Sequence, residues 1–134
     1  MKILVIDAQG GGLGKELITK LRARHKDLDI TCVGTNSLAT SAMLKAGANR
    51  GATGENPVVV NAAKADIILG PIGIMLTNSL YGEITEKISQ AVSLSPAIKI
   101  LIPFRHDDNI IVGISDYSIK KLVDLAMIEV EKNL

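Results

Sequence analysis

Aromatic side chains are nearly absent from this 134-residue chain, which has no Trp, one Phe and two Tyr. Proteins that bind single-stranded nucleic acids stack the bases on aromatic side chains, and this chain lacks such platforms. An excess of positive charge is also lacking, because 14 acidic residues offset 15 basic ones and the formal net charge is +1. A protein that neutralises many phosphates needs a basic surface. We therefore expect no nucleic-acid partner.

Cysteine and long hydrophobic runs are equally scarce. Cys32 is the only cysteine, so the chain has no intrachain disulfide and fits a reducing, cytoplasmic compartment. It lies in an apolar stretch and is predicted to be a small buried hydrophobe. The most apolar segment, residues 67–76, contains two glycines and a proline and is shorter than the roughly 20 residues that span a bilayer. The N-terminal apolar run is too short for a signal peptide, so we expect no membrane association.

The chain does have a large share of aliphatic residues. Continuous apolar runs alternate along it with segments whose apolar residues have helical spacing. With 47% hydrophobic residues, residues 1–134 are long enough to form one domain with its own core. Apolar runs predict strands at residues 3–6, 30–33, 66–69, 98–102 and 110–114, with a weaker strand at 49–53. Helical spacing and capping residues predict helices that begin near Leu13, Ser37, Pro57, Thr85 and Ser118.

This alternation of strands and helices predicts a doubly wound α/β fold, Rossmann-like, with a mostly parallel sheet. The last two predicted strands, at residues 98–102 and 110–114, are separated by a polar loop that is too short for a crossover helix. Parallel strands need a connection of a dozen or more residues. We therefore predict that these two strands form an antiparallel C-terminal pair.

A glycine-rich segment joins the first predicted strand to the first predicted helix. In doubly wound folds, backbone N–H groups and the positive end of the helix bind a phosphate at this place. The candidate cofactor-binding residues here are Gln9, Gly10, Gly11, Gly12, Leu13, Gly14 and Lys15. The dinucleotide pattern G-x-G-x-x-G fits Gly11 and Gly14 but finds Gln9 in its first place. The reductase pattern G-x-x-x-G-x-G fits Gly12 and Gly14 but meets Ala8. A turn that only lets the strand and the helix pack closely is the alternative.

The same segment, from Gly11 to Lys15, resembles the deviant phosphate loop of ParA-like ATPases. Glu16 stands where a Ser or Thr hydroxyl is wanted to hold the magnesium ion, and no later apolar strand ends in the Asp that completes such a metal site. A degenerate P-loop nucleotide binder is therefore the less favoured interpretation, and no metal site is predicted.

Two polar residues follow the second predicted strand, where dinucleotide-binding domains carry an acidic residue that binds the ribose hydroxyls. Here the positions hold Thr35 and Asn36, and no carboxylate is present in the segment to repel a 2′-phosphate. This favours NADP over NAD as the cofactor, although no arginine is present there to bind the additional phosphate. Asn36 is also a good helix cap, and the two roles are compatible.

Further candidates lie at the predicted carboxyl edge of the sheet. Gly70, Pro71 and Gly73 follow a buried strand that is expected to face the glycine segment across the ligand crevice. Glu55 is the loop carboxylate with the best position for ligand contact, and a capping or solvated role is its alternative. His106, beside Asp107, is a candidate acid–base group, although a polar loop explains it equally well. No catalytic residue is assigned.

The stretches IDAQGGGLGK, GTNSLATSAMLKAGA, ATGENPVVVNA, ADIILGPIGI, NSLYGEIT and KILIP together resemble a bacterial family of small proteins that is described only as a domain of unknown function. The resemblance covers nearly the whole chain. It implies a shared fold, and it implies no activity, substrate or catalytic residues.

The sequence thus favours a protein that binds a small phosphorylated ligand, an NADP-like or NAD-like nucleotide cofactor, at the glycine segment. Whether it is an enzyme is left open. The alternative is a nonenzymatic sensor or an oligomeric assembly protein without nucleotide binding. The mean hydropathy of +0.29 is high for a small soluble chain. We therefore predict a homodimer or higher homo-oligomer, formed through the small-residue helix at 38–46 and the apolar segment at 72–76.

Overall fold

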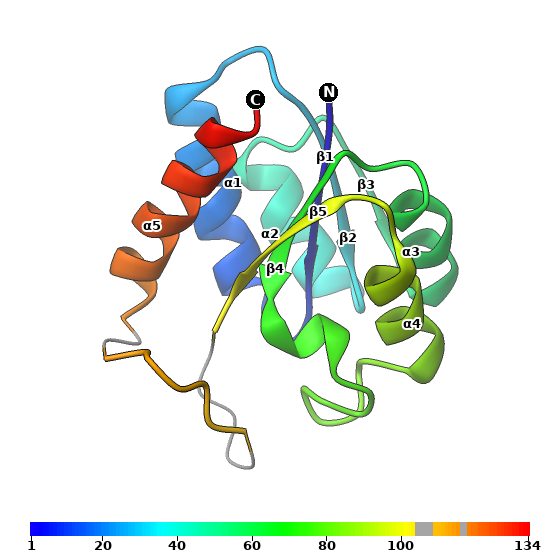
Figure 1. Ribbon diagram of the computed structural model, residues 1–134. Coiled ribbons are helices and arrows are strands. Elements are labelled where there is room, and N and C mark those ends of the chain that lie inside the picture. The colour runs from blue at the N-terminus through cyan, green and yellow to red at the C-terminus, as the bar shows by residue number, and fades with distance from the viewer. Residues whose placement is uncertain (104–108, 116–117) are drawn as a thin grey trace.

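The computed structural model describes residues 1–103, 109–115 and 118–134, and it shows a central sheet with helices on both faces (Figure 1). In chain order the elements are β1 (Lys2–Asp7), α1 (Gly12–Arg24), β2 (Asp29–Gly34), α2 (Ser37–Ala46), β3 (Arg50–Thr53), α3 (Glu55–Ala62), β4 (Ile67–Pro71), the 3-10 helix η1 (Ile72–Met75), α4 (Glu86–Leu94), β5 (Ile98–Ile102) and α5 (Ile119–Lys132).

The sheet has five strands in the order β3-β2-β1-β4-β5, and every pairing between neighbours is parallel. Helices α1, α2 and α5 contribute to the hydrophobic cluster on one face, and α3 and α4 contribute to the cluster on the other. The strand order reverses direction between β1 and β4. In a doubly wound sheet the chain connections diverge at this point, and a crevice opens at the carboxyl ends of the two strands.

The predicted antiparallel C-terminal pair is wrong. Strand β5 instead pairs with β4 in parallel, through the crossover helix α4. Residues 110–114 form no strand, and the side chains of Ile110 and Val112 are 87% and 93% exposed. A short aliphatic run has strand propensity only where neighbouring strands and side chains pack against it, and the described residues leave Ile110 and Val112 uncovered.

Strand β1 has buried side chains on both faces, as its continuous aliphatic run predicts. Ile3 and Val5 point into the cluster with α1 and α5, whereas Leu4 and Ile6 point into the cluster with α3 and α4. Since successive side chains of a strand point to opposite faces, one short run serves both layers.

Cys32 of the neighbouring β2 is fully buried, and burial raises the pKa of its thiol to about 11.

The element boundaries follow most of the predicted caps. The side chain of Asn36 accepts a hydrogen bond from Ala39 N at the start of α2, and Thr85 accepts one from Ile88 N at the start of α4. Helix α3, however, begins at Glu55, two residues before the predicted start.

Within the part of the chain that the structure describes, no helix has the length and apolar character needed to cross a membrane.

Candidate functional site

A cavity of about 380 Å³ lies at the carboxyl ends of β1 and β4, where the strand order reverses. Its position is the crevice that the fold predicts, at the edge of the sheet where β1 and β4 end. It is lined by Asp7, Ala8, Gln9, Gly10, Gly11, Gly12, Leu13, Pro71, Leu80 and Ile119. The glycine segment between β1 and α1 therefore forms one wall, and apolar side chains from three other parts of the chain form the rest.

The glycine segment turns sharply before α1 begins. Gln9 and Gly11 both have left-handed backbone angles, with φ of 52° and 74°, and Gly11 N donates to Ala8 O at 3.0 Å. A Cβ atom on Gly11 would lie 2.8 Å from the Cα of Ala39 in α2. The absence of a side chain at Gly11 is therefore required by the turn and by the packing against α2.

Asp7, at the end of β1, ties this strand to the first turn of α1. Its buried carboxylate accepts hydrogen bonds from Ala8 N at 2.8 Å and from Gly14 N at 2.7 Å. Burial raises the pKa of Asp7 above its ordinary value, against the lowering effect of these two bonds, and the negative charge of Glu83 raises it further. A Cβ atom on Gly14 would lie 2.5 Å from the Sδ of Met43, so Gly14 is also required by packing.

Gly10 and Gly12 differ from these two glycines. Neither has a positive φ, and a Cβ atom built on either would meet nothing within 4 Å. Both residues are exposed at the cavity. The N–H groups of Gly12 and Leu13, in the first turn of α1, donate to no acceptor among the residues the structure describes. The protein's own packing therefore does not explain these two glycines, and the two backbone donors belong to residues that line the cavity.

Thr35 and Asn36, which follow β2, both donate hydrogen bonds to the carboxylate of Glu83, a residue that no local pattern of the sequence brings to this place. The Oε1 of Glu83 accepts hydrogen bonds from Thr35 Oγ1 and from Asn36 Nδ2, each at 2.7 Å. Gln9 N donates to both carboxylate oxygens, at 3.2 Å and 3.1 Å. Asn36 Nδ2 also donates to Gln9 O at 2.9 Å, so the two loops are joined.

This contact removes the basis for preferring NADP, since that preference rested on the absence of a carboxylate near Thr35. Desolvation raises the pKa of Glu83, but the hydrogen bonds from Thr35, Asn36 and Gln9 outweigh it, so the pKa lies below its ordinary value. Glu83 is therefore an anion at neutral pH. It lies far from Thr35 in the sequence, and no local spacing indicates that the two side chains meet.

Of the three residues predicted to face the glycine segment from β4 and η1, only Pro71 lines the cavity. A Cβ atom on Gly70 would lie less than 3.0 Å from the carbonyl oxygen of Ile6, so Gly70 permits the close packing of β4 against β1. Gly73 is buried, and its carbonyl accepts a hydrogen bond from Ser79 Oγ at 2.5 Å.

Three other candidates lie away from the cavity or outside the described residues. Glu55, at the start of α3, accepts a hydrogen bond from Thr85 Oγ1 at 2.5 Å and so joins α3 to α4. The Lys15 side chain is exposed on α1, and it pairs with no acceptor among the residues the structure describes. His106 lies in residues 104–108, outside the described part of the chain.

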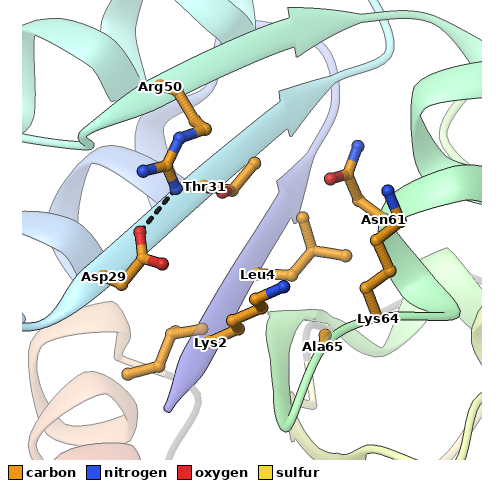
Figure 2. A pocket seen from close by; sticks show the side chains of 9 residues that line it. Lys2, Leu4, Asp29, Thr31, Arg50, Asn61, Lys64 and Ala65 are labelled. Atoms are coloured by element: carbon orange, nitrogen blue, oxygen red, sulfur yellow. Dashed lines mark hydrogen bonds and ion pairs between the residues drawn. The ribbon is translucent and has the colours of Figure 1, made fainter.

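A second cavity, of about 310 Å³, lies against the amino ends of β1, β2 and β3 (Figure 2). Lys2, Arg50 and Lys64 line it together with Asp29. Arg50 Nη1 donates to Asp29 at 2.5 Å and to Thr31 Oγ1 at 3.1 Å. An exposed ion pair of this kind contributes about 0–1 kcal/mol. Because ligands of doubly wound folds bind at the carboxyl ends of the strands, the candidate site is the first cavity.

The all-parallel sheet, its strand order and the glycine turn at the crevice define a Rossmann-like α/β protein. Residues 2–134 match the family described as "Domain of unknown function (DUF3842)", and the chain belongs to that family. No curated protein matches the sequence.

Among solved structures, the chain is similar to a dodecameric FMN-dependent UbiX-like decarboxylase from Escherichia coli O157:H7. The two share 12% sequence identity with a TM-score of 0.50, over 98% of this chain and 95% of the other. At this identity the likeness concerns the fold alone.

Proposed function

We propose that the protein binds a phosphorylated, nucleotide-derived cofactor in the crevice between β1 and β4. The observation that carries this proposal is the pair Gly10 and Gly12. Neither residue needs to be glycine for the sake of packing or backbone angle, and both border the cavity. A glycine that the fold does not require is explained by a ligand that approaches the backbone closely.

The residues of the crevice fit such a ligand. A phosphate accepts hydrogen bonds from the N–H groups of Gly12 and Leu13, at the positive end of the 13-residue helix α1. Pro71, Leu80 and Ile119 offer an apolar wall to a ring system. A flavin or nicotinamide bound there supplies redox chemistry. The solved neighbour is an FMN-dependent enzyme, which makes FMN the first cofactor to test, followed by NAD.

We expect FMN or another nucleotide cofactor to raise the melting temperature of the purified protein. A ligand that binds only the folded state, present at about a hundred times its Kd, stabilises a protein by about 2.7 kcal/mol. Replacing Gly12 by leucine should abolish the rise, because the new side chain occupies open space at the cavity that the ligand would fill. Differential scanning fluorimetry with FMN, NAD, NADP, ATP and a nucleotide sugar measures both effects.

The matched control is Ser41→Leu, which adds the same side chain at an exposed position of α2. Both variants should melt near the wild type without ligand, since the Gly12 position has room and an ordinary φ. A panel in which no ligand moves the melting temperature contradicts the proposal. It would favour a nonenzymatic sensor or assembly protein whose glycine turn binds nothing.

We also propose that the protein is a homo-oligomer. The surfaces expected from the sequence are partly exposed: Ala39, Met43 and Ile74 are buried, whereas Leu38 and Leu44 of α2 are 67% and 41% exposed. Further exposed apolar side chains lie on α4, on β5, in the segment between β5 and α5, and on α5, namely Leu94, Ile98, Ile110, Val112, Leu125 and Ile128. An apolar cavity of about 360 Å³ lies between β5 and α5. Exposed apolar patches mark interaction sites, and the solved neighbour is dodecameric.

Light scattering across a dilution series should therefore give a mass well above the 14.2 kDa of one chain. Leu125→Glu should lower that mass, because it places a charge on the exposed apolar side of α5. Ser41→Glu, on the exposed side of α2, should leave it unchanged. A wild-type mass that stays at 14.2 kDa at the highest concentration contradicts self-association.

A further inference from the structure

Glu83 brings its carboxylate to the end of β2, although the residue itself belongs to the turn between η1 and α4. Thr35 directly follows β2, and Asn36 caps the next helix. Many dinucleotide-binding proteins carry an acidic residue at this edge, which accepts a hydrogen bond from a ribose hydroxyl. Here the carboxyl end of β2 supplies no acid, and a distant part of the chain supplies one at the same place.

The carboxylate has unused capacity for hydrogen bonding. Its Oε1 accepts from Thr35, Asn36 and Gln9 N, whereas among the described residues Oε2 accepts only from Gln9 N, at 3.1 Å. An ionised carboxylate offers about four lone-pair sites. Oε2 therefore has room for a further donor, and a sugar hydroxyl is a donor of suitable size.

The turn that carries Glu83 is held by its own hydrogen bonds. Asn78 N donates to Ile84 O at 2.7 Å, and Glu83 N donates to Leu80 O at 3.2 Å. Asn78, Leu80 and Tyr81 all have left-handed backbone angles, which non-glycine residues adopt only where the surroundings enforce them. The position of Glu83 is therefore set before any ligand arrives, and Leu80 of the same turn lines the cavity.

We infer that Glu83 determines which sugar the crevice accepts: its carboxylate binds an unmodified ribose hydroxyl and repels a 2′-phosphate. This inference rests on the proposed function. Two anions at hydrogen-bond distance repel each other strongly unless a cation lies between them. Glu83 adjoins the cavity through its bonds to Gln9, and neither the described residues that line the cavity nor the hydrogen-bond partners of the Glu83 carboxylate include a Lys or Arg that would neutralise a second anion.

NAD and NADP differ only in the 2′-phosphate, and their affinities test the inference directly. Isothermal titration of the wild type should give a Kd for NAD at least about tenfold below that for NADP, which corresponds to about 1.4 kcal/mol. Glu83→Gln keeps the size and an acceptor for Thr35 and Asn36 but removes the charge. The variant should bind NAD more weakly and NADP more tightly than the wild type does. The ratio of the Kd for NADP to the Kd for NAD should therefore fall about tenfold.

Glu86→Gln is the matched control. It removes one negative charge from the exposed first turn of α4, away from Thr35 and Asn36, and should leave the ratio unchanged. Equal affinity of the wild type for NAD and NADP overturns the inference. It is also overturned if the ratio of the Kd for NADP to the Kd for NAD is the same in Glu83→Gln as in the wild type. Binding of FMN without binding of NAD or NADP overturns it too, but leaves the proposed function standing. Both the inference and the proposed function are overturned only if no nucleotide binds.

Discussion

Replacing Gly70 by alanine is expected to lower the free energy of unfolding by about 3 kcal/mol, because the new methyl group has no space. The Cβ atom would lie less than 3.0 Å from the carbonyl oxygen of Ile6 and 3.0 Å from the Cδ1 of Ile74. The Ile6 oxygen belongs to the backbone of β1, which is paired on both sides by β2 and β4. The Ile6 oxygen cannot rotate away as the end of the Ile74 side chain can, so the two central strands must separate.

Gly10→Ala is the control for this prediction. Gly10 has open space around it and no positive φ, so the same substitution there should change the unfolding free energy by no more than about 0.5 kcal/mol. Urea denaturation of the two variants gives both values. Equal stabilities would show that β1 and β4 are not packed as closely as the structure has them.

Leu69→Ala is expected to lower the free energy of unfolding by about 4 kcal/mol. Leu69 is fully buried in the central strand β4 and belongs to the cluster beneath α1 and α5. Its truncation leaves a cavity among side chains from β1, α1 and α5, which are fixed by their own packing and cannot all move inward.

The matched control for Leu69 is the same substitution at Leu94, whose side chain is 80% exposed at the end of α4. Leu94→Ala should change stability by no more than about 0.5 kcal/mol. Calorimetry or chemical denaturation measures the difference between the two variants. A loss below about 1 kcal/mol at Leu69 would contradict its place in the core.

The doubly wound arrangement was predictable because the buried strands have aliphatic runs and helices α2 and α4 have clear N-caps. Asn36 and Thr85 are caps in the structure, as their residue types indicate. The antiparallel pair was wrongly predicted because the aliphatic run at 110–114 has the composition of a strand. Composition does not reveal whether a neighbouring strand is present, and Ile110 and Val112 remain exposed.

The site was predictable only where it is local in the sequence. The glycine segment was recognised because it directly joins a strand to a helix, but the sequence does not separate Gly11 and Gly14, which packing requires, from Gly10 and Gly12, which it does not. That distinction depends on the neighbours that α2 brings to the loop. Glu83 was missed for the same reason, since only the folded chain brings its turn to Gln9.

The parallel sheet also has a consequence for the order in which the protein folds. Every described strand pair is joined through at least one helix, and the central pair brings Ile3 beside Ile67. Closing long loops costs entropy before the strands gain any packing energy, so parallel topologies fold slowly. We expect β1, α1 and β2 to associate early, and β4 to join β1 late. Because that late step creates the crevice, a folding intermediate without it has no binding site, and ligand binding marks the completed fold.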